Sequence, residues 1–380
     1  MGHYICINVK NSNLYIKNFV CRNALMFYKW FIFVIIWSAT FSLRAQEKPA
    51  QDTLLPWQAD FKKASGLVDS SKYKEAIVLL KKLVKEKPDF LEAMNKMAFA
   101  KMQIKEYKEA AKDLDKAELM TPMNFETEKL KGINFYLSEK FKESKVALDT
   151  AIAIAKEEKI DDPEIHYYRA LLMFKGKSYK LALGECETVL DMDGKFVKAI
   201  TLKGEIRFAM KDYNYAIKEL NEAIEKTPVE KTDYNSYKLR AKSKFEVRDF
   251  KGAVSDWNVY IDAIPKEEEA YIARGAAKIN SNDNSSAISD LDEAIKLNPK
   301  NPISYCYRGV AKGGNKSYAE ALTDLDYAIK LKFDYAEAFV NRAAIKMAIK
   351  DKRGACQDLE KADSLGDEMA IKLVERYCKG

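Results

Sequence analysis

The segment Glu268–Asn301, EEAYIARGAAKINSNDNSSAISDLDEAIKLNPKN, decides the fold. Its first half places Tyr271, Gly275 and Ile279 on one face of a helix, because they recur at helical spacing. A polar turn at 280–284 precedes a second helical stretch, whose spaced small and apolar residues are Ala287, Leu291 and Ala294. The segment therefore predicts two antiparallel helices joined by a short turn.

Three kinds of residue recur every 34 positions in the last part of the chain. They are the arginines Arg240, Arg274, Arg308 and Arg342; the aspartates Asp256, Asp290, Asp324 and Asp358; and the alanines Ala253, Ala287, Ala321 and Ala355. A fixed period of this size is typical of an array of helical hairpins, in which each unit packs on its neighbours.

The same pattern continues toward the N-terminus in a more divergent form. A small residue, a turn aromatic and an alanine at the start of the second helix define nine repeats, with Ser144 replacing that alanine once. The repeats start near residues 57, 91, 125, 163, 197, 234, 268, 302 and 336, and they cover 57–369. No proline falls inside an expected helix, where it would cost about 3 kcal/mol.

This arrangement resembles the tetratricopeptide repeat (TPR) in its small residue, turn aromatic, alanines and terminal proline. The resemblance implies an all-α fold, a right-handed α-solenoid of about nine helix-turn-helix units. Residues 370–380 are expected to form a helix that caps the last apolar face. In this family the first helices of the hairpins line a concave groove, which binds an extended or helical protein segment.

The arginines and aspartates predict a structural ladder of ion pairs. Arg274 can reach either Asp290, sixteen residues later in its own hairpin, or Asp256 of the preceding hairpin. The alternative is a row of arginines exposed to anionic partners. The regular recurrence favours packing, since contacts with a ligand vary from repeat to repeat.

The N-terminal region is interpreted as a leader. Residues 30–43 form an apolar run too short to span a bilayer, and it follows Lys29, so 26–45 is expected to be a signal peptide cleaved after Ala45. An uncleaved membrane anchor is the alternative. Residues 1–25 are interpreted as a mis-assigned upstream extension and 46–56 as a linker. The ending Arg44-Ala45-Gln46 resembles signal peptides of Bacteroidetes-type bacteria.

The charge balance gives no indication of nucleic-acid binding. The net charge is +7, but residues 1–45 hold five basic residues and no acidic ones, which leaves 59 basic against 57 acidic residues elsewhere. With both signs interspersed, no basic patch marks a nucleic-acid surface. After cleavage of the leader no stable membrane span is expected.

Catalysis is not indicated, and no metal site or cofactor is expected. After the leader the chain has a single histidine, His166, and no closely spaced pair of cysteines. Cys356 and Cys378 are expected at adjoining ends of two antiparallel helices, where they either form a disulfide or remain free thiols.

One apolar side chain per repeat lies late in the first helix, with further ones a turn earlier. These residues either pack against the next repeat or form the floor of a partner-binding groove: Phe99, Met102, Ile133, Tyr136, Leu171, Phe174, Phe208 and Phe245. The lysine–asparagine pair of the TPR carboxylate clamp is missing, since Ile133 follows Lys129 and Lys242 follows Lys238.

The sequence thus predicts a non-enzymatic protein–protein interaction scaffold or adaptor, exported to the periplasm or cell surface of a bacterium. The alternative is an accessory subunit of an envelope enzyme or secretion complex.

Overall fold

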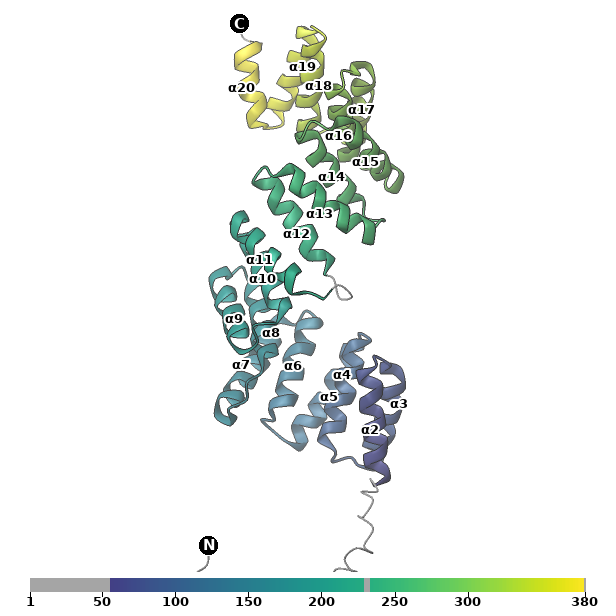
Figure 1. The fold of residues 1–380 in the computed structure, drawn as a ribbon, viewed down its shortest axis with the longest axis vertical. Coiled ribbons are helices and arrows are strands. Elements are labelled where there is room, and N and C mark those ends of the chain that lie inside the picture. Colours follow the sequence, from purple (N-terminus) through teal and green to yellow (C-terminus); the bar gives the residue numbers. More distant parts are fainter. Residues whose placement is uncertain (1–54, 229–232, 379–380) are drawn as a thin grey trace, which may run out of the picture. The chain divides into compact units, whose positions relative to one another are not determined.

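The computed structural model describes residues 55–228 and 233–378. Within these ranges the secondary structure consists of nineteen α-helices and no strand, so the expectation of an all-α fold is confirmed (Figure 1). None of the helices in the described ranges has the length and apolar character needed to cross a membrane. The expected leader, residues 26–45, and the extension before it lie outside the described residues.

The chain divides into two compact units, Met1–Ala93 and Met94–Gly380. The described part of the first unit is one hairpin, α2 (Pro56–Asp69) and α3 (Tyr73–Glu86), followed by the first residues of α4 (Leu91–Gln103). Its aromatic cluster brings the rings of Trp57 and Phe61 to 5.3 Å and 4.7 Å from Phe90.

The second unit continues the alternation of helices. We call the first helix of each hairpin its A helix and the second its B helix. After α4 they are α5 (Tyr107–Met120), α6 (Phe125–Leu137), α7 (Phe141–Glu158), α8 (Pro163–Lys175), α9 (Tyr179–Met192), α10 (Val197–Ala209), α11 (Tyr213–Lys226), α12 (Tyr234–Glu246), α13 (Phe250–Ala263), α14 (Glu268–Asn280), α15 (Asn284–Leu297), α16 (Pro302–Gly314), α17 (Tyr318–Leu331), α18 (Ala336–Ala348), α19 (Lys352–Ser364) and α20 (Glu368–Tyr377).

Two kinds of contact connect successive hairpins. From α5 to α18 each B helix packs on the A helix that follows it, and from α6 to α18 each A helix also contacts the next A helix. The A helices therefore form one continuous face, which we call the A-helix face. It positions the candidate site.

Each hairpin turn contains one residue in the left-handed backbone region. It lies two positions before the B helix, with φ between 57° and 69°, at Ser71, Lys105, Glu139, Lys177, Lys211, Arg248, Asn282, Lys316 and Lys350. In the turn at Asn282, the Asp283 N–H donates to the Lys278 carbonyl over 2.8 Å, as in a Schellman helix end. The same backbone geometry thus ends every A helix, and the left-handed residue is never a glycine.

Alanines at the start of the B helices form the close contact between the two helices. All eight have no exposed surface: Ala76, Ala110, Ala182, Ala216, Ala253, Ala287, Ala321 and Ala355. Ser144 is equally buried, and its hydroxyl donates to the Gly132 carbonyl over 2.7 Å. A buried hydroxyl with a partner avoids the desolvation cost of an unpaired one, so serine fits this position.

Gly204 gives a test of this packing. A Cβ added to it would lie 2.6 Å from Leu220 Cγ on α11. The added methyl group destabilises the fold by overpacking more than alanine stabilises the helix through its higher propensity. We therefore expect Gly204→Ala to lower the free energy of unfolding by about 1–2 kcal/mol in urea denaturation.

Gly184, inside α9, is the matched control, because a Cβ there would meet nothing within 4 Å. Gly184→Ala should raise the free energy of unfolding by up to about 1 kcal/mol through helix propensity alone. Equal effects of the two substitutions on the free energy of unfolding would show that the contact with Leu220 is not the reason for a glycine at position 204.

Candidate functional site

A cavity of about 230 Å³ lies on the A-helix face of the second unit. We call it the A-helix pocket. Its lining comes from four successive hairpins and includes Phe208, Phe245, Trp257, Ile272, Ala276 and Tyr307. Trp257 is 1% exposed and belongs to the core of the α12–α13 hairpin. The pocket is therefore an apolar cavity supported by a rigid aromatic residue.

Two of the charged side chains that line the A-helix pocket, Lys242 and Glu269, form an ion pair. Lys242 Nζ lies 2.6 Å from Glu269 Oε1, and its hydrogen bond is the main cause that lowers the pKa of the Glu269 carboxyl group. Burial raises the pKa of Tyr307, which already lies well above neutral pH, to about 12. The pocket thus combines apolar walls with an ion pair and a tyrosine in its lining.

A second cavity of about 510 Å³ lies beside α8 and α10, and it is also bordered at the end of α11 and the start of α12 by Thr227, Pro228, Asp233 and Asn235. We call it the Glu205 pocket; Tyr167, Leu171, Leu202 and Glu205 line it. Glu205 is half-buried, and within the described part of the chain no hydrogen-bond or ion-pair partner contacts its carboxylate. Burial raises the pKa of this carboxyl group, with a smaller opposing effect of Lys175.

The eight apolar residues expected to form a groove have different surroundings in the structure. Phe208 and Phe245 line the A-helix pocket, and Leu171 lines the Glu205 pocket. The groove assignment was wrong for Met102 and Ile133. Their side chains are 2% and 5% exposed, and both belong to one core cluster. They pack against neighbouring repeats and are closed to a partner.

Phe99, Tyr136 and Phe174 are half-buried and are held mainly by packing. Phe99 lies against the same core cluster as Met102, and the ring of Tyr136 lies 5.8 Å from Phe141 and 5.5 Å from Tyr168. Phe174 contacts the turn residue Tyr179 with ring centroids 5.9 Å apart. Phe208 and Phe245 make the same contact with their turn residues, at 5.6 Å from Tyr213 and 5.3 Å from Phe250, and line the A-helix pocket as well.

The prediction of groove residues missed Glu205, Ile272, Tyr167 and Tyr307. A signal for Glu205 existed, since it occupies the repeat position that carries Leu171 in the preceding repeat and Lys242 in the next. A charged residue at a repeat position that holds an apolar residue in the preceding repeat indicates a role other than packing. Tyr307 had no such signal, because α16 begins 105 residues after α10 and only the stacking of hairpins joins them.

The arginines of the ladder bind the aspartates of their own hairpins. Arg274 donates from Nε and Nη2 to Asp290 at 2.9 Å and 2.7 Å, and its Nη1 donates to Asn258 over 2.9 Å. The Asp256 carboxylate instead binds Arg240. The same two-pronged pairing joins Arg308 to Asp324 and Arg342 to Asp358.

Each arginine–aspartate pair is joined by a lysine that was not predicted from the sequence. Lys244, Lys278, Lys312 and Lys346 lie one turn after the four arginines, and each ammonium approaches its aspartate to 2.8–2.9 Å. The aspartates are 3–4% exposed. With the guanidinium groups engaged by these carboxylates, the ladder forms part of the packing of the array.

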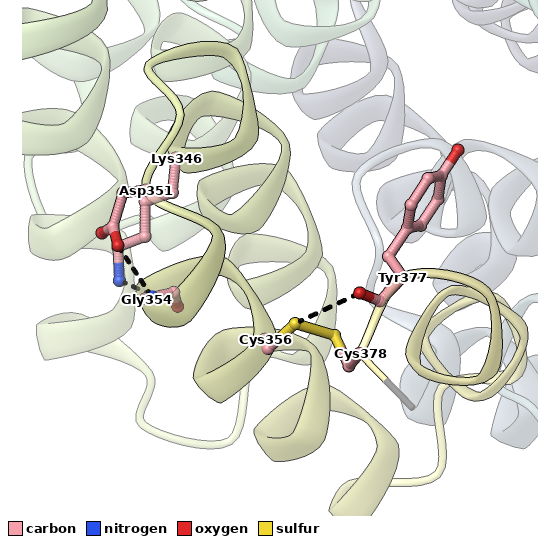
Figure 2. The surroundings of a disulfide bond; sticks show 6 residues. All are labelled: Lys346, Asp351, Gly354, Cys356, Tyr377 and Cys378. Atoms are coloured by element: carbon pink, nitrogen blue, oxygen red, sulfur yellow. Dashed lines mark hydrogen bonds between the residues drawn. A yellow bond between two sulfur atoms is a disulfide. The ribbon is translucent and has the colours of Figure 1, made fainter. Parts of the chain in front are cut away.

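Cys356 and Cys378 are joined by a disulfide (Figure 2). It connects α19 to the residue that follows α20, whose Ala370 and Val374 are buried against the preceding hairpin. Cys186 and Cys306 are buried free thiols, and burial raises their pKa to about 12 and about 11. His166 Nδ1 lies 2.8 Å from Glu185 Oε2, within the packing of the α8–α9 hairpin.

Comparison with known proteins shows likeness to helical repeat proteins. A family model described as tetratricopeptide repeat matches residues 67–128. "DnaJ protein P58IPK homolog B" of Oryza sativa subsp. japonica is 26% identical over 186 residues, covering 45% of this chain and 39% of that protein. "Hsp70-Hsp90 organizing protein 3" of Arabidopsis thaliana is 26% identical over 173 residues, covering 44% and 28%. The chain spans less than two fifths of the length of these relatives.

Among solved structures, PilW, described as a widely conserved type IV pilus biogenesis factor, superposes with a TM-score of 0.51. It is 15% identical and covers 57% of this chain and 98% of its own, so the likeness concerns the fold alone. The helix order, the packing and these matches define the fold as an all-α solenoid of the tetratricopeptide-repeat type.

Proposed function

We propose that the chain is a non-enzymatic scaffold or adaptor of the bacterial cell envelope, which binds a segment of a protein partner on its A-helix face. The observation that carries this proposal is the A-helix pocket, whose apolar walls come from α10, α12, α14 and α16. Such a cavity accommodates an apolar side chain of an extended or helical segment.

The charged and polar groups at the A-helix pocket also favour binding over chemistry. Lys242 and Glu269 neutralise each other at the rim of the A-helix pocket, and Tyr307 contributes a hydroxyl that stays protonated at neutral pH. Groups of this kind orient a partner by hydrogen bonds and do not supply a nucleophile.

Two observations support an exported location. The sequence of residues 26–45 has the form of a signal peptide, and the Cys356–Cys378 disulfide is of the kind that persists in an oxidising compartment such as the periplasm. The partner is accordingly sought in the envelope.

Photo-crosslinking tests the proposal in the native cell. Benzoylphenylalanine replaces Phe245 in the A-helix pocket or, as the control, Tyr215, an exposed aromatic residue on α11. We expect a discrete crosslinked protein from the envelope fraction with the probe at 245, absent with the probe at 215 and lost when Phe208→Glu is added.

Circular dichroism has to show that Phe208→Glu retains the helical fold. A discrete crosslink at 215 with none at 245 would place the partner on the B helices and overturn the proposal for the A-helix face. A crosslink at 245 that persists in the Phe208→Glu variant would contradict the role of the A-helix pocket.

A further inference from the structure

We propose that Glu205 makes the A-helix face selective for partner segments that carry a lysine or arginine close to an aromatic or large aliphatic residue. This inference rests on the proposed function, because it assigns a specificity to the same face.

The two pockets adjoin along α10. Glu205 lines the Glu205 pocket, and Phe208, three residues later and one helical turn away, lines the A-helix pocket. A partner segment that places an apolar side chain against Phe208 and Phe245 therefore has Glu205 within reach of a neighbouring side chain.

In the described part of the chain, Glu205 lacks the ion-pair partner that other carboxylates on its own and nearby hairpins have. Glu269 is paired with Lys242, Glu185 with Arg169 and Glu219 with Lys203. Among the described residues none forms an ion pair or hydrogen bond with the Glu205 carboxylate. A half-buried charge without a partner is unfavourable for the free protein, and a cation from a bound partner would remove that cost.

The surroundings of Glu205 also suit a cation. Asp233, at the same pocket, adds a second negative charge that raises the pKa of Glu205, although Lys175 lowers that pKa by more than Asp233 raises it. The wall residue Tyr167 offers an aromatic ring, which attracts an ammonium or guanidinium group. The one lysine in the lining, Lys198, is exposed and interacts with Glu164. The charge of the pocket is therefore complementary to a basic side chain.

A random dodecapeptide library displayed on phage tests the specificity with the full chain immobilised. We expect the enriched peptides to share a lysine or arginine within about four positions of an aromatic or large aliphatic residue. For a synthetic peptide of this type, Glu205→Gln should weaken binding about tenfold or more in titration calorimetry, as expected for loss of a charge-assisted hydrogen bond.

Glu225→Gln is the matched control, since Glu225 is exposed on α11 of the same hairpin. It should leave the affinity unchanged. Glu205→Lys should reverse the selection and enrich acidic peptides. Because glutamine is close to glutamate in shape and removes an unpaired charge, Glu205→Gln should keep the unfolding midpoint of the wild type or raise it.

The outcomes separate this inference from the proposed function. Enriched apolar peptides that need Phe208 but show no basic residue, or whose affinity survives Glu205→Gln, would overturn the specificity and leave the binding face intact. Enrichment of acidic peptides by the wild-type chain would overturn it as well. Failure to select any peptide whose binding depends on Phe208 would contradict both.

Discussion

Asp290→Ala should lower the free energy of unfolding of the second unit by about 3–5 kcal/mol, measured by urea denaturation. Asp290 is 4% exposed, accepts hydrogen bonds from Arg274, and forms an ion pair with Lys278 at 2.8 Å. Its removal leaves two cations in a largely buried site without their counter-charge. The effect therefore exceeds that of an exposed ion pair, which is about 0–1 kcal/mol.

Asp262→Ala is the control, because Asp262 is exposed on α13. It should change stability by less than about 0.5 kcal/mol. A double-mutant cycle should give a coupling energy between Arg274 and Asp290 and none between Arg274 and Asp256. Additive effects of the first pair would show that the two-pronged contact contributes nothing beyond the separate residues.

Reduction of the Cys356–Cys378 disulfide should destabilise the C-terminal hairpin and its cap by roughly 3 kcal/mol. The bonded residues are 22 positions apart, and the chain-entropy model assigns this value to a loop of that length. The bond holds the end of α20 on α19 (Figure 2). Val374 of α20 packs there with Ala355 and Leu359. Hydrogen exchange with and without reductant should show earlier opening of α20 and α19 in the reduced protein.

The double variant Cys356→Ser/Cys378→Ser is the control for the reductant. It should show the exchange of the reduced wild-type protein under both conditions, while Cys186→Ser should keep the response to reductant. Alkylation of both Cys356 and Cys378 in the unreduced, denatured protein would contradict the disulfide.

The sequence predicted the hairpins because the determinants are local. The apolar spacing of Tyr271 and Ile279 requires only the geometry of one helix, and small residues such as Gly275 mark where its partner crosses. The spacing of Arg274 and Asp290 likewise lies within a single hairpin. It left open which of two aspartates the arginine binds, because both lie on helices that adjoin α14.

The candidate site was only partly predictable, as the apolar series shows. Met102 and Phe245 occupy the same repeat position, yet the first is 2% exposed and the second lines the A-helix pocket. Met102 packs with Leu130 and Ile133 of the next A helix, α6, so its burial depends on the distance to that helix and on the side chains it carries. A pattern within one repeat contains no information about that distance.

By itself, the sequence determined an all-α array of helical hairpins with a buried small-residue seam and an acid–base ladder. Only the tertiary structure decided that Lys278 also pairs with Asp290 and that Tyr307 and Phe208 line one pocket. It also decided that Glu205 has no ion-pair partner among the described residues. The physical reason is that periodicity fixes the face on which a side chain lies. Its burial and its partners depend on contacts between hairpins far apart in the chain.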